Sequence, residues 1–81
     1  MRLVFSSDRP ITLSSLQPGE TGVVVAIDAG DNGRTDRLLA LGVTPGATVT
    51  VLQVYPGIVF LCDQTEIAIE RAMASGVIVQ R

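Results

Sequence analysis

One stretch near the middle of the chain, residues 37–46 with the sequence RLLALGVTPG, constrains the fold more than any other. Leu38 and Leu41 share one face of a short helix, because residues three apart lie on the same side. Gly42 follows the last apolar helical residue, where the left-handed residue that ends a helix is most often glycine. Val43 comes next, within reach of Leu38, as in a Schellman helix end. The stretch therefore predicts a short helix with a defined end.

A turn is predicted directly after this helix. Pro45 disfavours helix at the residue before it, and Pro45-Gly46 suits the two central positions of a type II turn. At the other end, Thr35 or Asn32 is expected to cap the helix, with Asp36 in the first turn. So short a helix with so few apolar positions is not stable alone in water. We therefore expect it to pack onto a larger structure.

The composition indicates one compact domain. A chain of 81 residues buries about two-thirds of the surface that it exposes when unfolded. Its hydrophobic content of 47% and mean hydropathy of +0.44 argue against disorder and leave apolar surface for a partner. The formal net charge is −2, and all six basic residues are arginine. This balance lacks the basic patch that binds nucleic acid or anionic lipid, so neither partner is expected.

The cysteine content and the hydropathy pattern bear on the compartment. One cysteine, Cys62, permits no internal disulfide, which fits a reducing environment. No apolar run approaches the roughly 18 residues that span a bilayer, and the N-terminus lacks the regions of a signal peptide. We expect a soluble cytoplasmic protein that does not insert into a membrane.

Short apolar runs separated by turn residues predict a mainly β domain. Residues 1–10 form an N-terminal leader before it, and the domain is expected over residues 11–81. Five short strands with one short α-helix favour a small compact β-barrel over an open sheet, with the helix closing one mouth. Residues 71–75 are expected to form a single helical turn. The expected strands are residues 21–28, 48–54, 58–62, 66–70 and 77–79.

Two of these runs predict details of the barrel. Residues 23–27 (VVVAI) are too continuously apolar for a strand with one face in water, so burial of both faces is expected. In residues 48–54 the apolar positions alternate through Val51 and then change phase at Leu52. A slip of one residue moves side chains to the other face, so a β-bulge or bend is expected there.

The residues that carry enzyme chemistry are largely missing. The chain has no histidine, the commonest general base and metal ligand. A single cysteine in an apolar strand is more often a small core residue than a nucleophile. The acidic loop at residues 28–36 lacks the glutamate that ends a calcium-binding EF-hand, and Leu39 stands in that place. We therefore expect no catalytic residue, no metal ligand, no cofactor and no enzyme activity.

Two groups of charged residues each allow two interpretations. Glu66 and Glu70 alternate with apolar residues, so they serve solubility or discourage strand pairing at a sheet edge. Arg34 and Arg37 lie at the start of the helix. They are either surface charges without a specific role or contacts with a partner, since arginine is enriched in binding hot spots.

The ordered set of motifs resembles the FeoA family. Residues 13–20 (LSSLQPGE), a variable loop and residues 37–46 carry the resemblance, which extends to the end of the chain. Members of this family are small cytoplasmic accessory proteins of bacterial ferrous iron uptake, with an SH3-like barrel fold. The resemblance thus implies an SH3-like β-barrel over residues 11–81. Residues 55–58 (YPGI) form a shorter hairpin tip than is usual in the family, which implies an altered contact if that tip binds a partner.

The resemblance also implies a partner and a set of contacts. The partner is FeoB, the membrane transporter with a cytoplasmic GTPase domain, and the role is to bind its cytoplasmic part and support or tune transport. The protein is then peripheral to the inner membrane through that partner. Leu38, Gly42 and Gly46 form the structural motif. Packing and helix termination alone would require Leu38, Leu41 and Gly42, so Leu41 has a structural interpretation as well as a partner-binding one. The candidate partner contacts are Leu16, Pro18, Arg34, Arg37, Leu41, Val43 and Pro45.

Other classes of function remain open. The same module resembles the C-terminal domain of DtxR-type metal-dependent repressors, which implies a regulatory domain. A domain that binds proline-rich peptides needs an aromatic groove, and three aromatic residues without tryptophan provide a poor one. Apolar edge strands in a small barrel favour self-association. The transporter accessory protein is the preferred interpretation.

Overall fold

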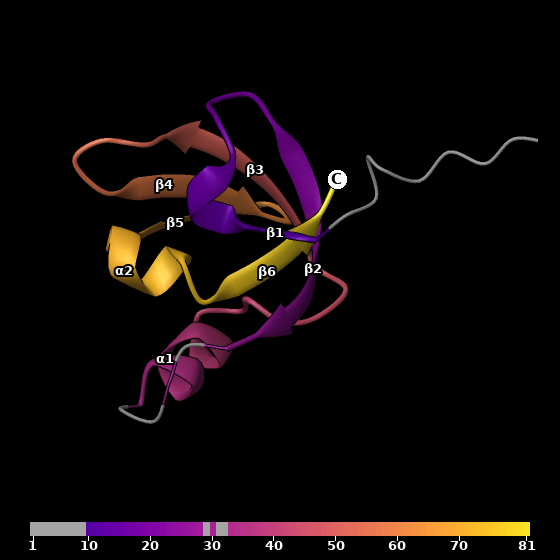
Figure 1. Cartoon of the computed structure of the whole chain (residues 1–81), viewed down its shortest axis with the longest axis vertical. Helices are drawn as coiled ribbons and strands as arrows, with labels where there is room; N and C mark the ends of the chain where they lie inside the picture. Colours follow the sequence, from indigo (N-terminus) through magenta and orange to yellow (C-terminus); the bar gives the residue numbers. More distant parts are fainter. Residues whose placement is uncertain (1–9, 29, 31–32) are drawn as a thin grey trace, which may run out of the picture.

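The structure is a computed structural model that describes residues 10–28, 30 and 33–81 (Figure 1). The expected leader lies almost wholly outside these residues. One antiparallel sheet contains the strands in the order β1-β6-β2-β3-β4-β5 and curls around a single core, so the fold is mainly β as predicted. The elements are β1 (Ile11–Thr12), the 3₁₀ helix η2 (Leu13–Ser15), β2 (Thr21–Ile27), α1 (Arg34–Ala40), β3 (Thr48–Gln53), β4 (Ile58–Cys62), β5 (Thr65–Ile69), α2 (Arg71–Ala74) and β6 (Val77–Gln80).

The strand count differs from the expectation at one edge. The described part of the chain contains six strands rather than about five, because Ile11 and Thr12 pair with β6 as a two-residue edge strand. A strand so short has no periodicity that a sequence pattern could reveal. The expected helical turn at residues 71–75 is confirmed as α2, which contacts η2.

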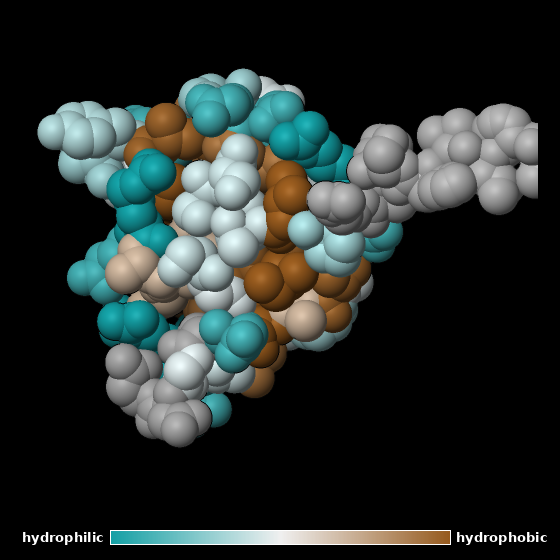
Figure 2. Space-filling model, viewed as in Figure 1, coloured by the Kyte–Doolittle hydropathy of each residue, from teal (hydrophilic) through white to brown (hydrophobic). Residues whose placement is uncertain are grey.

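The core lies on the inner face of the curled sheet. β4 alternates between buried and partly exposed residues, and Phe60 at its centre is the largest fully buried side chain. Leu13 and Leu16, at the two ends of the η2 segment, are also fully buried and reach the core from outside the sheet. Figure 2 shows that some apolar surface stays exposed among hydrophilic residues on the face that carries β1 and β6.

The expectation that β2 is buried on both faces was wrong. Val24 is fully buried, whereas Val23 and Val25 are 41% and 40% exposed. β2 lies between β6 and β3, so its hydrogen bonds are satisfied on both edges without any cover over its outer face. The continuous apolar run reflects the preference of β-branched residues for extended backbone as well as burial.

The β-bulge predicted near Leu52 is confirmed, and β2 contains a second one. The register between β3 and β4 shifts between Val51 and Gln53, which leaves Leu52 as the extra residue, 43% exposed. The register between β2 and β6 shifts between Val24 and Ala26 in the same way. Each bulge bends its strand and increases its twist, which helps the sheet to curl.

The end of α1 has the predicted Schellman geometry. The Val43 N–H donates to the Leu38 carbonyl at 2.9 Å, and the Gly42 N–H donates to the Leu39 carbonyl at 3.0 Å. Gly42 has a φ of 96°, in the left-handed region that favours glycine. The turn that follows is also as predicted, with Gly46 at φ 97°.

The start of α1 differs from the expectation. The N-cap is Gly33, with no side-chain cap, and Thr35 lies inside the helix. The alternative cap, Asn32, lies outside the described residues. Leu38 is the one buried residue of α1, and the helix lies at one end of the curled sheet in Figure 1, as expected for a helix that closes a barrel mouth. No helix in the described ranges is long and apolar enough to cross a membrane.

Candidate functional site

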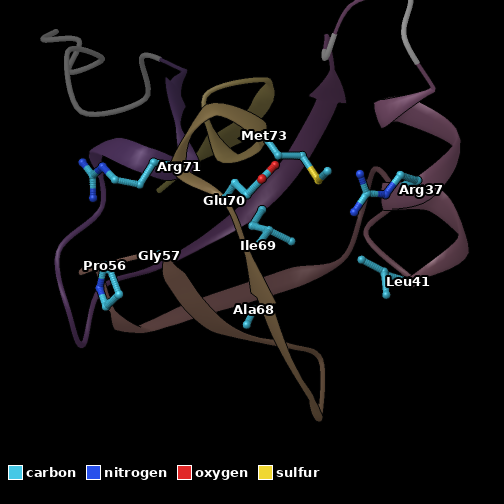
Figure 3. Close-up of a pocket in the computed structure, with 9 residues that line it drawn as sticks. All are labelled: Arg37, Leu41, Pro56, Gly57, Ala68, Ile69, Glu70, Arg71 and Met73. Atoms are coloured by element: carbon cyan, nitrogen blue, oxygen red, sulfur yellow. The ribbon is translucent and has the colours of Figure 1, made fainter.

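A surface pocket of about 580 Å³ lies between α1 and the corner where β5 passes into α2 (Figure 3). Three segments that are distant in the sequence form its walls: α1 with its end, the β3–β4 connection, and β5 with α2. The lining residues are Arg37, Leu41, Pro56, Gly57, Ala68, Ile69, Glu70, Arg71 and Met73.

Arg37 and Leu41 form the wall on the side of α1. They are four residues apart and therefore share one face of the helix, while Leu38 points to the core. Leu41 is 45% exposed, and in Figure 3 both side chains extend toward the opposite wall. The helix is thus anchored by one leucine and presents another to solvent.

The opposite wall is a sharp corner between β5 and α2. The Glu70 carbonyl accepts hydrogen bonds from the N–H groups of Met73 and Ala74, both at 3.0 Å, so the chain turns into α2 directly after the strand. Met73 is buried at this corner, and Glu70 is exposed. The Arg71 guanidinium donates to the Val54 carbonyl, which ties the corner to the end of β3.

The β3–β4 connection completes the pocket with Pro56 and Gly57. A side chain at position 57 would bring its Cβ to 3.0 Å from the Ile69 carbonyl oxygen, so the close approach of the two segments favours glycine. The short tip at residues 55–58, noted as a departure from the family pattern, therefore contributes to the wall of the pocket. Tyr55 at its end is 80% exposed.

The structure divides the predicted contact residues into three groups. Arg37 and Leu41 line the pocket. Pro18, Pro45 and Arg34 do not line it; the two prolines are exposed in turns and Arg34 is partly buried.

The remaining two candidates need correction. Leu16 and Val43 are fully buried, so neither can contact a partner in this structure. Leu16 packs into the core beside η2, and Val43 is held inside by the Schellman hydrogen bond to Leu38.

The pocket is lined by apolar and charged side chains. No group of three side chains that could hold a metal ion occurs in the part of the chain that the structure describes. Cys62 is buried outside the pocket and its thiol lies 3.4 Å from the Gly42 carbonyl oxygen, to which it donates. Burial, with a smaller contribution from the Asp63 carboxylate, raises the pKa of the Cys62 thiol, so the unreactive protonated form is favoured. The pocket offers apolar side chains, two guanidinium groups and one carboxylate.

Sequence patterns missed most of the pocket. Glu70 was recognised only as an exposed charge and Ile69 only as a strand residue. The Pro56-Gly57 turn was the one available signal that this segment had a special conformation. No local pattern reveals that the ends of β3 and β5 meet opposite α1, because these contacts join residues distant in the chain.

Comparisons with known proteins agree with the resemblance in the motifs. The sequence model of the FeoA domain matches residues 11–81. A crystal structure of an iron uptake regulatory protein, FeoA, is 34% identical, has a TM-score of 0.79 and covers 88% of this chain and 95% of its own. No curated protein matches this chain.

Two further solved structures place the fold. Stenotrophomonas maltophilia FeoA, crystallised with zinc and described as a prokaryotic SH3 domain protein, is 25% identical with a TM-score of 0.76, covering 85% of this chain and 88% of its own. IdeR from T. acidophilum has a TM-score of 0.81 at 21% identity and covers 99% of this chain but 36% of its own. The likeness to IdeR concerns the fold alone.

Proposed function

Because this chain belongs to the FeoA family, we propose that it is a non-enzymatic accessory protein of bacterial ferrous iron uptake. Its partner is the cytoplasmic part of a FeoB-type membrane GTPase transporter, and its role is to support or tune transport. The protein acts in the cytoplasm and reaches the inner membrane through that partner.

The single observation that carries this proposal is the pocket wall on α1. Leu41 is 45% exposed next to Arg37, on a helix whose anchoring is already provided by Leu38. Protein contact surfaces combine an apolar centre with arginine and a polar rim. Leu41, Ala68 and Ile69 supply apolar surface here, and Arg37, Glu70 and Arg71 supply the charges.

The alternative is a regulatory domain like the C-terminal part of DtxR-type repressors. It is supported by the shared fold with IdeR, at 21% sequence identity. Fold alone does not specify function, whereas the family match extends over residues 11–81. We therefore prefer the transporter accessory protein.

The test is direct binding between this protein and the cytoplasmic GTPase domain of the FeoB-type transporter of the same organism. Titration calorimetry measures the affinity, and GTP turnover by the domain is followed with and without this protein. We expect binding that weakens in Arg37→Glu. The control is Arg34→Glu, which makes the same charge change on the same helix outside the pocket.

Absence of binding to both the isolated GTPase domain and the full transporter in lipid nanodiscs would contradict the proposal. Capture of a DNA-binding repressor instead, with a folded protein, would favour the regulatory alternative.

A further inference from the structure

In the part of the chain that the structure describes, backbone groups on the outer edge of β5 have no hydrogen-bond partner. β5 pairs with β4 on one side and is the last strand of the sheet within the described ranges. Cys62 and Thr65 pair across the two-residue turn, so Thr65 and Ile67 direct their backbone groups toward β4. The N–H and C=O groups of Glu66 and Ala68 therefore point away from the sheet. The Ile69 carbonyl oxygen would lie 3.0 Å from a Cβ at position 57, the residue that immediately precedes β4. The Ile69 carbonyl therefore points toward β4, which agrees with this alternation of backbone directions.

This edge lies beside the pocket already described. Ala68 and Ile69 line it on one side, and Arg37 and Leu41 of α1 line it on the other. In Figure 3 β5 and α1 face each other across the space. The volume of about 580 Å³ accommodates several residues of extended chain. A strand added to β5 would thus lie between the sheet and α1.

The side chains of β5 specify what such a strand would carry. Ile67 and Ile69 are buried on the inner face, and Glu66, Ala68 and Glu70 are exposed on the outer face. An added strand alternates in the same way, since successive side chains point to opposite faces. Its inner residues would meet Leu41 and Ile69, so they should be apolar.

The outer residues of the added strand would stand beside Glu66 and Glu70. Neither carboxylate forms an ion pair with a residue that the structure describes; the ion pair present joins Arg81 and Glu20. Opposite charges across neighbouring strands are favourable, so lysine or arginine should occupy these positions.

The same charges disfavour a second copy of this chain as the occupant. Antiparallel pairing of two β5 strands about Ala68 would place Glu66 opposite Glu70 of the second copy, twice. Like charges directly opposite each other destabilise a strand pair. Self-association through this register of β5 is therefore not expected.

We propose that an extended segment of a protein partner, with alternating apolar and basic side chains, adds to the free edge of β5 and lies between β5 and α1. The inference rests on the proposed function for the existence of such a partner, and it specifies how that partner is held. Recognition combines backbone hydrogen bonds for affinity with alternate side-chain pockets for specificity.

The test uses ¹⁵N-labelled protein and a short blocked peptide, as long as β5, in which lysine and valine alternate. We expect saturable shifts of the pocket residues and slower hydrogen exchange at the amides of Glu66 and Ala68. The matched probe is the peptide in which glutamate replaces lysine, which should bind at least about threefold more weakly. Equal binding of both peptides, or no saturable change at millimolar peptide, would overturn the proposal.

Two variants examine the mechanism. Ala68→Pro removes the outward N–H and should weaken the lysine peptide about fivefold, the worth of one hydrogen bond. Proline is tolerated at such a position because the missing N–H is on the free side of an edge strand. Ala68→Ser keeps the N–H and should weaken binding less than Ala68→Pro does. If Ala68→Pro fails to fold, Glu66→Gln with Glu70→Gln should still weaken binding about threefold and reduce its salt dependence.

The outcomes separate this inference from the proposed function. Binding of the transporter's GTPase domain without slower exchange at Glu66 and Ala68 would overturn the strand addition and leave the accessory role intact. Binding of the lysine peptide without any binding of that domain would contradict the choice of partner. If hydrogen exchange at these amides slows as the concentration of this protein rises in the absence of peptide, a second copy occupies the edge, and the proposal is overturned.

Discussion

The two faces of α1 each carry a leucine, and the two leucines have different roles. Leu38 is fully buried and anchors the helix in the core, whereas Leu41, three residues later, is 45% exposed in the pocket wall. The inner face is determined by local rules: a Schellman end, a left-handed glycine and a turn. The outer face is determined by what the rest of the fold places opposite it.

A motif can therefore identify a family without identifying its contact surface. Val43, within the most characteristic stretch of the chain, is fully buried. The residues that remain for a partner are those that packing and helix termination do not use, and Arg37 and Leu41 are the ones that line the pocket. Substitutions on the two faces should therefore affect different properties, stability on the inner face and binding on the outer face.

Leu38→Ala should destabilise the protein by about 3 kcal/mol, because it removes a fully buried side chain and leaves a cavity. Leu39→Ala is the matched control on the same helix, 43% exposed, and should change stability by less than about 0.5 kcal/mol. Urea unfolding followed by circular dichroism measures both. Equal effects of the two substitutions would contradict the division between an inner and an outer face.

Gly42→Ala should cost about 1.5 kcal/mol, because residue 42 has a φ of 96° and a Cβ is strained there. No atom outside the neighbouring residues lies within 4 Å of that Cβ, so the cost is conformational rather than steric. Gly42→Asn should therefore cost less, since asparagine tolerates the left-handed region better. Thermal unfolding compares the two; a larger loss with asparagine would show that space limits this position.

Leu41→Ala should leave stability nearly unchanged and weaken binding to the transporter's GTPase domain about tenfold, a typical effect for a contact near the centre of an interface. Leu39→Ala, equally exposed but outside the pocket, should bind normally. Calorimetric titration with the three proteins provides the measurement. A loss of affinity in both variants would indicate that the whole helix, not the pocket wall, is the contact.

Cys62 lies on the buried side of the end of α1, because its thiol donates a hydrogen bond to the Gly42 carbonyl. Its titration therefore reports on this part of the inner face. Burial and the Asp63 carboxylate raise its pKa in the folded protein above the ordinary value of 9.0. The unfolded chain therefore loses this proton first as the pH rises. The stabilisation is complete below pH 9.0 and is lost as the pH increases through the folded pKa.

The expected loss is below about 1 kcal/mol. Urea midpoints at neutral pH and above pH 9.0 should fall further apart in the original protein than in Cys62→Ala, which has no thiol to titrate. An identical decrease in both proteins would show that other groups control the alkaline behaviour.

Local features of the fold could be predicted because local physics determines them. The glycine at the helix end, the Pro45-Gly46 turn and the bulge at Leu52 each follow from a few adjacent residues. Residues 23–27 could not be predicted correctly, since apolar composition alone does not tell a strand covered on both faces from a central strand with one face in water.

The candidate site could be predicted only in part, for a related reason. Arg37 and Leu41 were identified because they belong to one short helix. Glu70 and Met73 were not, because their role depends on the corner after β5 meeting α1 in space. Leu16 was placed on the surface since no pattern in its neighbourhood distinguishes a residue that leads into a turn from one that fills the core.

The two bulges have a consequence for how this sequence can vary. Inward positions in β2 are even-numbered up to Val24, and the next residue packed against the core is Ile27; in β3 they are odd-numbered up to Val51, and the next is Val54. Deleting Val25 or Leu52 would therefore remove the bulge and its bend but leave Ile27 or Val54 facing the core. Deleting a residue before a bulge, such as Val23 or Thr50, would instead turn the rest of that strand to the other face, so these positions should tolerate deletion least.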